Sequence, residues 1–318
     1  MVKIGYKLSS EDMNPLDLVL YAKMAEEAGF NFAMASDHYH PWVDKQGESP
    51  FVWCTLGGVS QSTTKLKVGT AVTCPTIRIN PVIIAQAAAT AASMMPGRFM
   101  LGLGSGENLN EHILGDPWPP AHIRIEMFAE AVKVIRMLWQ GGMQNFEGKY
   151  YTIENARIYT LPDELPPIFM AADGEKAARN AGRLADGLIT PGVKKGLVEI
   201  FKKSGGKGKP CYGEASVCWA ESREEAIKTA YDYWPIIANK GGINWELYSP
   251  KYFESLAKML DPETEIAGIT YGNNLQDHID KINRFIKAGY DHIFIHQLGP
   301  NQEGFIDFYK KEVLPEFI

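Results

Sequence analysis

The chain has 318 residues, of which 45% are hydrophobic and 22% charged, and its formal net charge at pH 7 is −6. This composition is ordinary for a globular enzyme with a large core. The net negative charge excludes the basic surface by which proteins bind nucleic acid, and no apolar run reaches the roughly 18 residues of a membrane-spanning helix. We therefore expect neither nucleic acid nor a membrane as a partner.

The cysteines and the amino terminus indicate a reducing compartment. No two cysteines show the short CxxC spacing of a zinc or redox site, so we expect no metal, and a disulfide framework is unusual in a chain of this length. The cysteines are Cys54, Cys74, Cys211 and Cys218. Met1 leads directly into an apolar segment without the pattern of a secretory leader, and we expect a cytoplasmic protein.

The first predicted elements are a strand at 4–6 and a helix that Asn14 caps, with Pro15 in its first turn and Gly29 at its end. Helical spacing puts four large apolar side chains on one face of this helix. These are Leu16, Val19, Leu20 and Met24.

Short apolar strands and helices then alternate along the chain. Strands are predicted at 32–35, 67–72, 99–103, 167–171, 187–190, 215–219 and 292–296, and helices at 81–92, 125–139, 175–183 and before Gly289. About eight strands separated by helices imply a parallel sheet, and this number favours an α/β fold, a (β/α)8 TIM barrel of one domain over 1–318, rather than an open sheet. Residues 230–275 lack the repeat and are predicted to be an insertion after a strand, where substrate-covering segments lie.

A cluster of polar and aromatic residues follows the predicted strand 32–35. Asp37, His38 and Trp42 are within it. In a parallel barrel, groups at the carboxyl ends of the strands point into the active site, and an imidazole there can exchange a proton near neutral pH. A hydrogen-bonded structural histidine is the alternative, and this pattern alone leaves both open.

Two further strand ends are candidate binding positions. The glycines of segment 101–108 do not have the spacing of a dinucleotide fingerprint, because the third glycine would fall on Glu107 or Leu109. They would instead let a flat cofactor lie close to the backbone, with Glu107 beside it, unless Glu107 is a plain surface residue. Segment 172–178 begins a helix whose free N–H groups suit a phosphate, although any capped helix looks the same.

Six segments of the sequence resemble the luciferase-like superfamily of flavin and deazaflavin enzymes, and within it the coenzyme F420-dependent glucose-6-phosphate dehydrogenases. These segments span residues 1 to about 190, and the last strand and helix of the chain match as well. The segments are specific for the family only when they are taken together. The F420-dependent secondary alcohol dehydrogenases are similar as well. The segments are Ser36-Asp37-His38 with Pro41-Trp42; Asn80-Pro81 with Ala85-Gln86; Pro96-Gly97-Arg98; Gly104-Ser105-Gly106-Glu107 with Asn110-Glu111; Asn145-Phe146-Glu147-Gly148-Lys149-Tyr150-Tyr151; and Ala181-Gly182-Arg183 with Asp186-Gly187.

The resemblance implies a homodimeric barrel enzyme that holds coenzyme F420 over its strand ends and transfers a hydride between the deazaflavin and an alcohol or sugar-type carbinol. It implies catalytic roles for His38, Trp42 and Glu107, with Asp37 holding the second nitrogen of His38 or the coenzyme. It also implies a non-proline cis bond at 71–72. The residues that would line the coenzyme are Asp37, Ala71, Val72, Cys74, Ser105, Asn110, Asp173, Gly174, Lys176 and Ala177.

One departure from this group concerns the substrate. The sugar-phosphate enzymes hold the phosphate with basic residues at three places, of which only the first, Lys194, is basic here. The other two fall near Asn244 and Gly268, with Lys195 or Lys240 as candidate replacements. A dianion loses charge-assisted bonds without such partners, so we expect an alcohol other than glucose 6-phosphate.

Two other functions are compatible with the sequence. An FMN-dependent monooxygenase of the same superfamily would need an oxygen-reactive flavin in place of the deazaflavin. A non-catalytic coenzyme-binding barrel would keep its biological effect without His38 and Glu107, although two titratable groups at neighbouring strand ends are unusual for binding alone.

Overall fold

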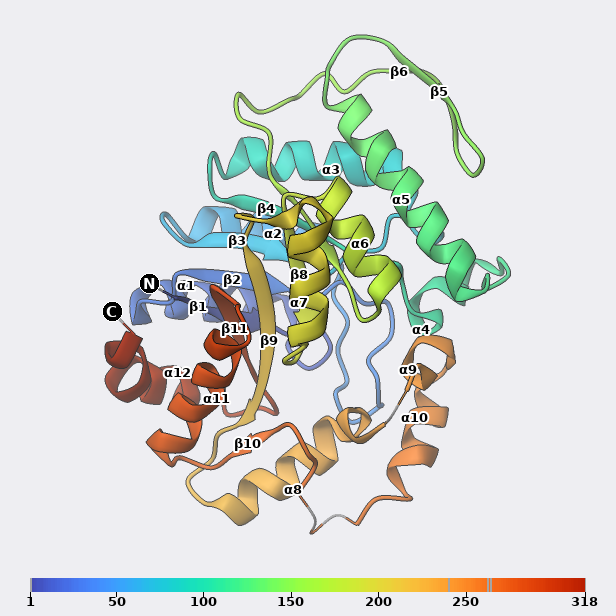
Figure 1. The fold of residues 1–318 in the computed structure, drawn as a ribbon. Helices are drawn as coiled ribbons and strands as arrows, with labels where there is room; N and C mark the ends of the chain where they lie inside the picture. The colour runs from blue at the N-terminus through green and yellow to red at the C-terminus, as the bar shows by residue number, and fades with distance from the viewer. Residues whose placement is uncertain (1, 240, 262, 264, 318) are drawn as a thin grey trace.

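The computed structural model describes residues 2–239, 241–261, 263 and 265–317, and its core is a closed barrel (Figure 1). The barrel strands are β1 (Lys3–Leu8), β2 (Phe32–Ala35), β3 (Lys67–Thr70), β4 (Phe99–Leu103), β7 (Ile168–Ala171), β8 (Gly187–Pro191), β9 (Cys211–Cys218) and β11 (His292–Gln297). Within the described chain, these eight parallel strands follow the order β9-β11-β1-β2-β3-β4-β7-β8, and pairing of β8 with β9 closes the ring. The predicted (β/α)8 TIM barrel is confirmed.

Helices flank the barrel on the outside (Figure 1). They are α1 (Pro15–Ala28), α2 (Val52–Ser62), α3 (Pro81–Met94), α5 (Ala121–Leu138), α6 (Glu175–Leu184), α7 (Lys195–Phe201), α11 (Leu275–Lys287) and α12 (Gln302–Phe308). The sequence pattern did not predict α2, α7 or α12. Short helical turns cover His112–Leu114, Lys202–Gly206, Pro235–Ala238, Tyr309–Val313 and Leu314–Phe317.

Helix α1 begins and ends as predicted but buries a different face. The Asn14 side chain accepts hydrogen bonds from two backbone N–H groups of the first turn, and Gly29 ends the helix in the left-handed region. Leu16, however, is 81% exposed and Leu20 is 45% exposed. The buried residues are Leu18, Ala22 and Ala25. Val19 and Met24 of the apolar face are partly buried against the core, whereas Leu16 and Leu20 are exposed, because the closest contact with the barrel is made by Leu18 and the small side chains of Ala22 and Ala25.

An insertion lies between β9 and α11, as predicted, but it begins before the predicted limit of 230, because its first helix starts at Arg223. It contains α8 (Arg223–Tyr233), α9 (Ile243–Glu246), α10 (Pro250–Ala257) and the short strand β10 (Thr270–Tyr271), which pairs with β9. A second excursion, between β4 and β7, carries the four-residue helix α4 (Asn108–Glu111) and the hairpin of β5 (Gln144–Glu147) and β6 (Thr152–Ala156). The Asn108 amide donates to the Glu246 carbonyl at 2.8 Å, so the two excursions meet.

The barrel interior is apolar in its middle and polar at its carboxyl end. Side chains alternate along each strand, and those that point inward form one cluster: Phe32, Met34, Ala71, Met100, Phe169, Ile189, Tyr212 and Phe294. Two residues further along their strands, Glu214 and His296 point inward as well. The Lys7 ammonium lies 5.7 Å from the centre of the Phe294 ring. The described chain contains no helix long and apolar enough to cross a membrane.

Candidate active site

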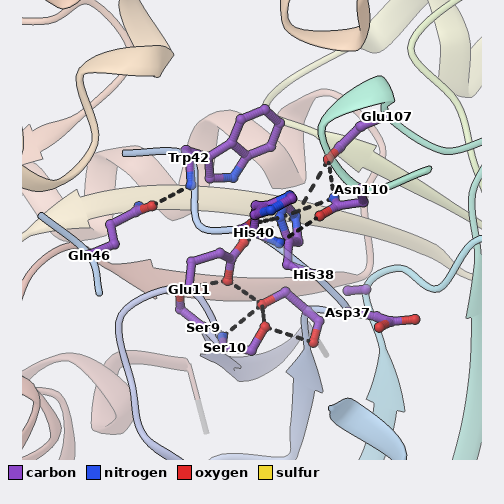
Figure 2. A network of polar contacts seen from close by, with 12 residues as sticks. Ser9, Ser10, Glu11, Asp37, His38, His40, Trp42, Gln46, Glu107 and Asn110 are labelled. Carbon is purple, nitrogen blue, oxygen red and sulfur yellow. Dashed lines mark hydrogen bonds and ion pairs between the residues drawn. The ribbon is translucent and has the colours of Figure 1, made fainter. Parts of the chain in front are cut away.

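The His38 imidazole lies between two carboxyl groups at the carboxyl end of the barrel. Its Nε2 atom is 3.3 Å from Glu11 Oε1 and 3.5 Å from Glu107 Oε2, as Figure 2 shows. Its Nδ1 atom is 3.1 Å from the His40 carbonyl oxygen, a hydrogen-bond acceptor, and 3.2 Å from the Asn110 amide nitrogen, a donor. His38 is 8% exposed. The side chain is therefore held at one nitrogen and surrounded by acids at the other.

Glu11 is a site residue that the sequence analysis missed. It follows β1 and is almost completely buried. The hydroxyl groups of Ser9 and Ser36 both donate to its Oε2 atom, which leaves Oε1 for His38. The signal was present in the sequence, because Glu11 stands after the first predicted strand as His38 stands after the second, and both positions lie at the same barrel end.

Asn110 connects the loop after β2 to the loop after β4. Its Oδ1 atom accepts hydrogen bonds from the backbone N–H groups of Tyr39 at 2.8 Å and His40 at 3.2 Å. Its Nδ2 atom donates to Glu107 Oε2 at 3.2 Å. Asn110 thereby fixes the loop that carries His38 and orients the facing carboxyl group, a role that the predicted coenzyme contact did not include.

The pKa values of the two carboxyl groups beside His38 are shifted in opposite directions. Burial raises the pKa of Glu107 from 4.5 to about 7, although the nearby His38 opposes this rise. Burial also acts to raise the pKa of Glu11, but the charges of His38 and Lys7 and the Ser36 hydroxyl outweigh burial and lower it. Paired groups whose pKa values are pushed apart are characteristic of acid–base sites.

We expect the Glu107→Gln substitution to stabilise the protein more at pH 8 than at pH 5. Because burial raises the pKa of Glu107 from 4.5 to about 7, the folded state holds this proton more tightly than the unfolded state. The free energy of unfolding therefore falls as pH rises through this range, by up to about 3 kcal/mol, and the neutral amide avoids that loss. Urea unfolding of the wild type and the variant at pH 5, 6.5 and 8 measures this difference in the free energy of unfolding.

The control for this experiment is Glu27→Gln, because Glu27 is exposed on α1. This variant should differ from the wild type by the same small amount at all three pH values. A Glu107→Gln variant whose stability difference also stays constant would show that Glu107 has an ordinary pKa.

Asp37 does not contact His38, so the expectation that it holds the second histidine nitrogen is wrong. Its carboxylate accepts a hydrogen bond from the Thr73 hydroxyl and one from Arg78 Nη2 at 2.8 Å. Consecutive residues of an extended chain point to opposite sides, and Figure 2 shows the Asp37 side chain directed away from the imidazole. The backbone N–H of Arg78 also donates a hydrogen bond to the Glu111 carboxylate at 2.7 Å.

Trp42, predicted to be catalytic, packs against the His38 imidazole. Its ring centre is 5.1 Å from that of His38, and on its other side it meets the edge of Phe253 from α10 at 5.2 Å. Trp42 is buried. The indole therefore separates His38 from the insertion and excludes water on that side.

A platform of small apolar residues lies at the same end of the barrel. The 71–72 peptide bond is a non-proline cis bond, as expected, and β3 ends just before it. Lys7 Nζ donates to the Ala71 carbonyl at 2.9 Å. Val72 and Ala171 pack on top of the interior cluster, and a Cβ atom at Gly104 would come within 2.5 Å of Val72 Cγ2. The small side chains of Val72 and Ala171, with no side chain at Gly104, fit the approach of an aromatic ring system.

Each of the remaining residues predicted to line the coenzyme has different neighbours. Gly174 precedes α6 without a side-chain cap, so the first N–H groups of the helix, at Glu175 to Ala177, have no capping partner. Lys176 lies 3.8 Å from the Glu126 carboxylate. The Cys74 thiol is 3.0 Å from the Thr76 hydroxyl; Ser105 is partly exposed just after β4.

The predicted phosphate positions offer little free positive charge. Lys194 Nζ makes an ion pair of 2.9 Å with Asp173, the residue predicted to line the coenzyme. The Asn244 amide bonds to Asn239 and to the Ile236 carbonyl. Gly268 contributes only its carbonyl group, to Lys281. Lys195 is exposed at the start of α7, and Lys240 lies outside the described residues. The described residues contain no group of three His, Cys, Asp or Glu side chains that could hold a metal ion.

Comparison with known proteins supports the resemblance seen in the sequence. F420-dependent glucose-6-phosphate dehydrogenases from Microbacterium testaceum and Nakamurella multipartita are 33% and 35% identical to the chain; each alignment covers 99% of this chain, with 97% and 96% of the respective relative. An F420-dependent secondary alcohol dehydrogenase, solved with an F420-acetone adduct, superimposes with a TM-score of 0.90 at 29% identity over 98% of both chains. Residues 2–292 match the family model described as luciferase-like monooxygenase. The chain belongs to this luciferase-like family.

Proposed function

We propose that this protein is a coenzyme F420-dependent oxidoreductase that transfers a hydride between the deazaflavin and an alcohol or sugar-type carbinol. The observation that carries the proposal is the His38 imidazole between Glu11 and Glu107, at the barrel end that also holds the platform of small apolar residues. Relatives that match over nearly the whole chain are named as F420-dependent dehydrogenases.

The residues of the platform and of the α6 start fit the two parts of the coenzyme. The Val72 and Ala171 side chains would support the ring system, and the uncapped N–H groups of α6 beside Lys176 would bind phosphate. When bound, the deazaflavin supplies a hydride acceptor that reacts poorly with oxygen. We propose that it is lined by Asp37, Ala71, Val72, Cys74, Ser105, Asn110, Asp173, Gly174, Lys176 and Ala177.

His38 is the group that takes the hydroxyl proton from the alcohol. Its Nδ1 atom is held between the His40 carbonyl and the Asn110 amide, so we assign Nε2, which faces the two carboxyl groups, as the atom that takes the proton. The ionised Glu11 carboxylate, 3.3 Å away, stabilises the imidazolium that forms. Glu107 has a pKa of about 7 and is the second proton-exchanging group. Trp42 keeps water from this side of the imidazole.

We expect the protein to bind F420 more tightly than FMN or NADP. The uncapped start of α6 and Lys176 would hold the phosphate of the coenzyme tail, and its ring would lie on the platform. Isothermal titration calorimetry with the three coenzymes measures the affinities, and Lys176→Ala should weaken F420 binding. Lys203→Ala, at an exposed lysine in the helical turn Lys202–Gly206, is the matched control.

Tighter binding of FMN would instead support the monooxygenase alternative. Monooxygenases are among the similar solved structures, but at 14–16% identity they show the fold alone. A non-catalytic barrel would bind F420 and turn over no alcohol.

We also propose a homodimer in the cytoplasm. Large apolar side chains are exposed on α1, on α3 and on the residue before α2, the helix that packs against both. They are Leu16, Leu20, Phe51 and Ile83. Exposed apolar surface of this kind marks interaction sites, and all four cysteines are free thiols, as in a reducing compartment.

Light scattering at micromolar concentration should give the mass of a dimer. The Leu16→Asp and Ile83→Asp variants should shift the protein toward the monomer, because a charge in the interface is left unpaired. Lys23→Glu, which changes a charge on the same α1 helix, is the control. A wild-type protein that stays monomeric would contradict the homodimer.

A further inference from the structure

A second carboxylate–imidazole pair lies at the carboxyl end of the barrel, apart from His38. The Nδ1 atom of His296 is 2.9 Å from Glu214 Oε1. Burial acts to raise the pKa of Glu214, but the charges of Lys7 and His296 outweigh burial and lower it to about 2. Glu214 is therefore an ionised acceptor, and Nδ1 must carry the proton that is shared with it. The other ring nitrogen of His296, Nε2, is not bonded to Glu214.

Two buried polar atoms at this place have no hydrogen-bond partner within the described residues. They are Nε2 of His296, a residue only 1% exposed, and Oδ1 of Asp12. Trp234 joins the two side chains, since its ring meets the His296 ring edge-on at 4.4 Å and its Nε1 atom donates to Asp12 Oδ2 at 3.5 Å. Buried polar atoms are nearly always paired in native proteins. A pair of unpaired atoms at one place therefore indicates a ligand group.

The unpaired atoms lie next to the reacting end of the site. Glu11, whose carboxylate contacts His38, interacts electrostatically with Asp12. Glu11 also interacts electrostatically with His296. A sugar-sized molecule whose reacting hydroxyl lies at His38 would extend to Asp12 and His296.

The chemistry of the pair fits a neutral hydroxyl group. A hydroxyl can donate to the Asp12 carboxylate or to a neutral Nε2 atom, and it can accept from a protonated one. The carboxylates of Glu11, Asp12 and Glu214 disfavour an anion such as phosphate. Lys7 does not offset them, because its ammonium group is already bonded to the Ala71 carbonyl and to Glu214.

We propose that Asp12 and His296 bind a second, non-reacting hydroxyl group of the substrate, so that the enzyme selects neutral alcohols with more than one hydroxyl. This inference rests on the proposed function. Trp234 forms the apolar wall of this subsite, and Glu214 orients His296 within it. The subsite determines which alcohol is accepted, whereas His38 acts on the hydroxyl that reacts.

The test compares propan-2-ol with propane-1,2-diol and glycerol as substrates of the F420-loaded enzyme. The diol should have a kcat/KM higher by about 10-fold or more, as expected for a hydrogen bond to a charged group. In His296→Asn, whose amide keeps the bond to Glu214 but lacks the Nε2 atom, this ratio should fall toward one. His296→Gln, whose amide reaches the Nε2 position, should keep part of it. His122→Asn, on the exposed surface of α5, is the control.

A wild-type enzyme without preference for the diol, or a ratio unchanged in His296→Asn, overturns the proposal. If none of these alcohols reacts, histidine ¹⁵N NMR of the F420-loaded protein decides. The Nε2 resonance of His296 is identified as the one that is missing in His296→Asn. Glycerol should shift this resonance, whereas propan-2-ol should not. The absence of a shift with glycerol overturns the subsite. Failure of the proposed function is seen separately, as the absence of F420 binding by calorimetry.

Discussion

Replacing His38 with alanine should lower kcat by about 10²–10⁴, the usual contribution of a general acid or base, while the affinity for F420 changes little. The reason is positional. Nε2 of His38 faces Glu11 and Glu107, and no other imidazole in the described chain is held between two carboxyl groups. Steady-state kinetics with any accepted alcohol, together with calorimetry of F420 binding, separates loss of chemistry from loss of the coenzyme.

The matched control for this substitution is His122→Ala, since His122 is exposed on α5. It should have wild-type kcat. Added imidazole should restore part of the activity of His38→Ala, because the vacated space between the two carboxyl groups can accept it. Unchanged turnover in His38→Ala would remove this residue from catalysis and favour the second imidazole, His296, as the base.

Glucose 6-phosphate should be a poor substrate compared with neutral alcohols. Two of the three expected phosphate positions, Asn244 and Gly268, have no basic side chain of their own, and the Lys281 ammonium beside Gly268 is bonded to its carbonyl. The third, Lys194, is paired with Asp173 at 2.9 Å. Two missing charged hydrogen-bond partners, at roughly 1.5–3 kcal/mol each, correspond to a loss of about 10²–10⁴ in affinity. The measurement is kcat/KM for glucose 6-phosphate and for glucose, which differ only in the phosphate.

The Lys194→Ala variant distinguishes the explanations for that result. If phosphate contributes little, this variant should treat glucose and glucose 6-phosphate as the wild type does. Lys203→Ala, an exposed lysine that was not predicted to bind phosphate, is its control. Efficient use of glucose 6-phosphate that is lost in Lys194→Ala alone would show that the ion pair with Asp173 opens for the substrate.

Local signals predicted most of the fold. Asn14, Pro15 and Gly29 mark the two ends of α1 because caps act within one turn, and the strands were found because they are short and apolar. The buried face of α1 was not predicted, because it depends on how closely the helix approaches the barrel, and no local pattern encodes that distance. Strand β3 likewise ends two residues before the predicted limit, at the cis bond.

The site was predictable as far as the strand-end rule reaches. That rule found His38 and Glu107 and would have found Glu11, had it been applied to the first strand. It could not find Glu214, which lies in the middle of β9, or pair it with His296, the last residue of the predicted strand 292–296, because the two become neighbours only through pairing of β9 with β11. The engagement of Asp37 by Thr73 and Arg78 was hidden for the same reason: contacts between separate loops are set by the closed barrel.

The closure of the ring has a consequence for how the protein is made. Strand β11 lies between β9 and β1, and it is the last barrel strand to be synthesised. Until it leaves the ribosome, β1 and β9 each present an open edge that can pair with another chain. Lys7 and Glu214, which flank the gap, would meanwhile be charges without the imidazole that completes their network. A chain that stops before residue 292 should accordingly aggregate rather than form a smaller working enzyme, although His38, Glu11 and Glu107 would all be present.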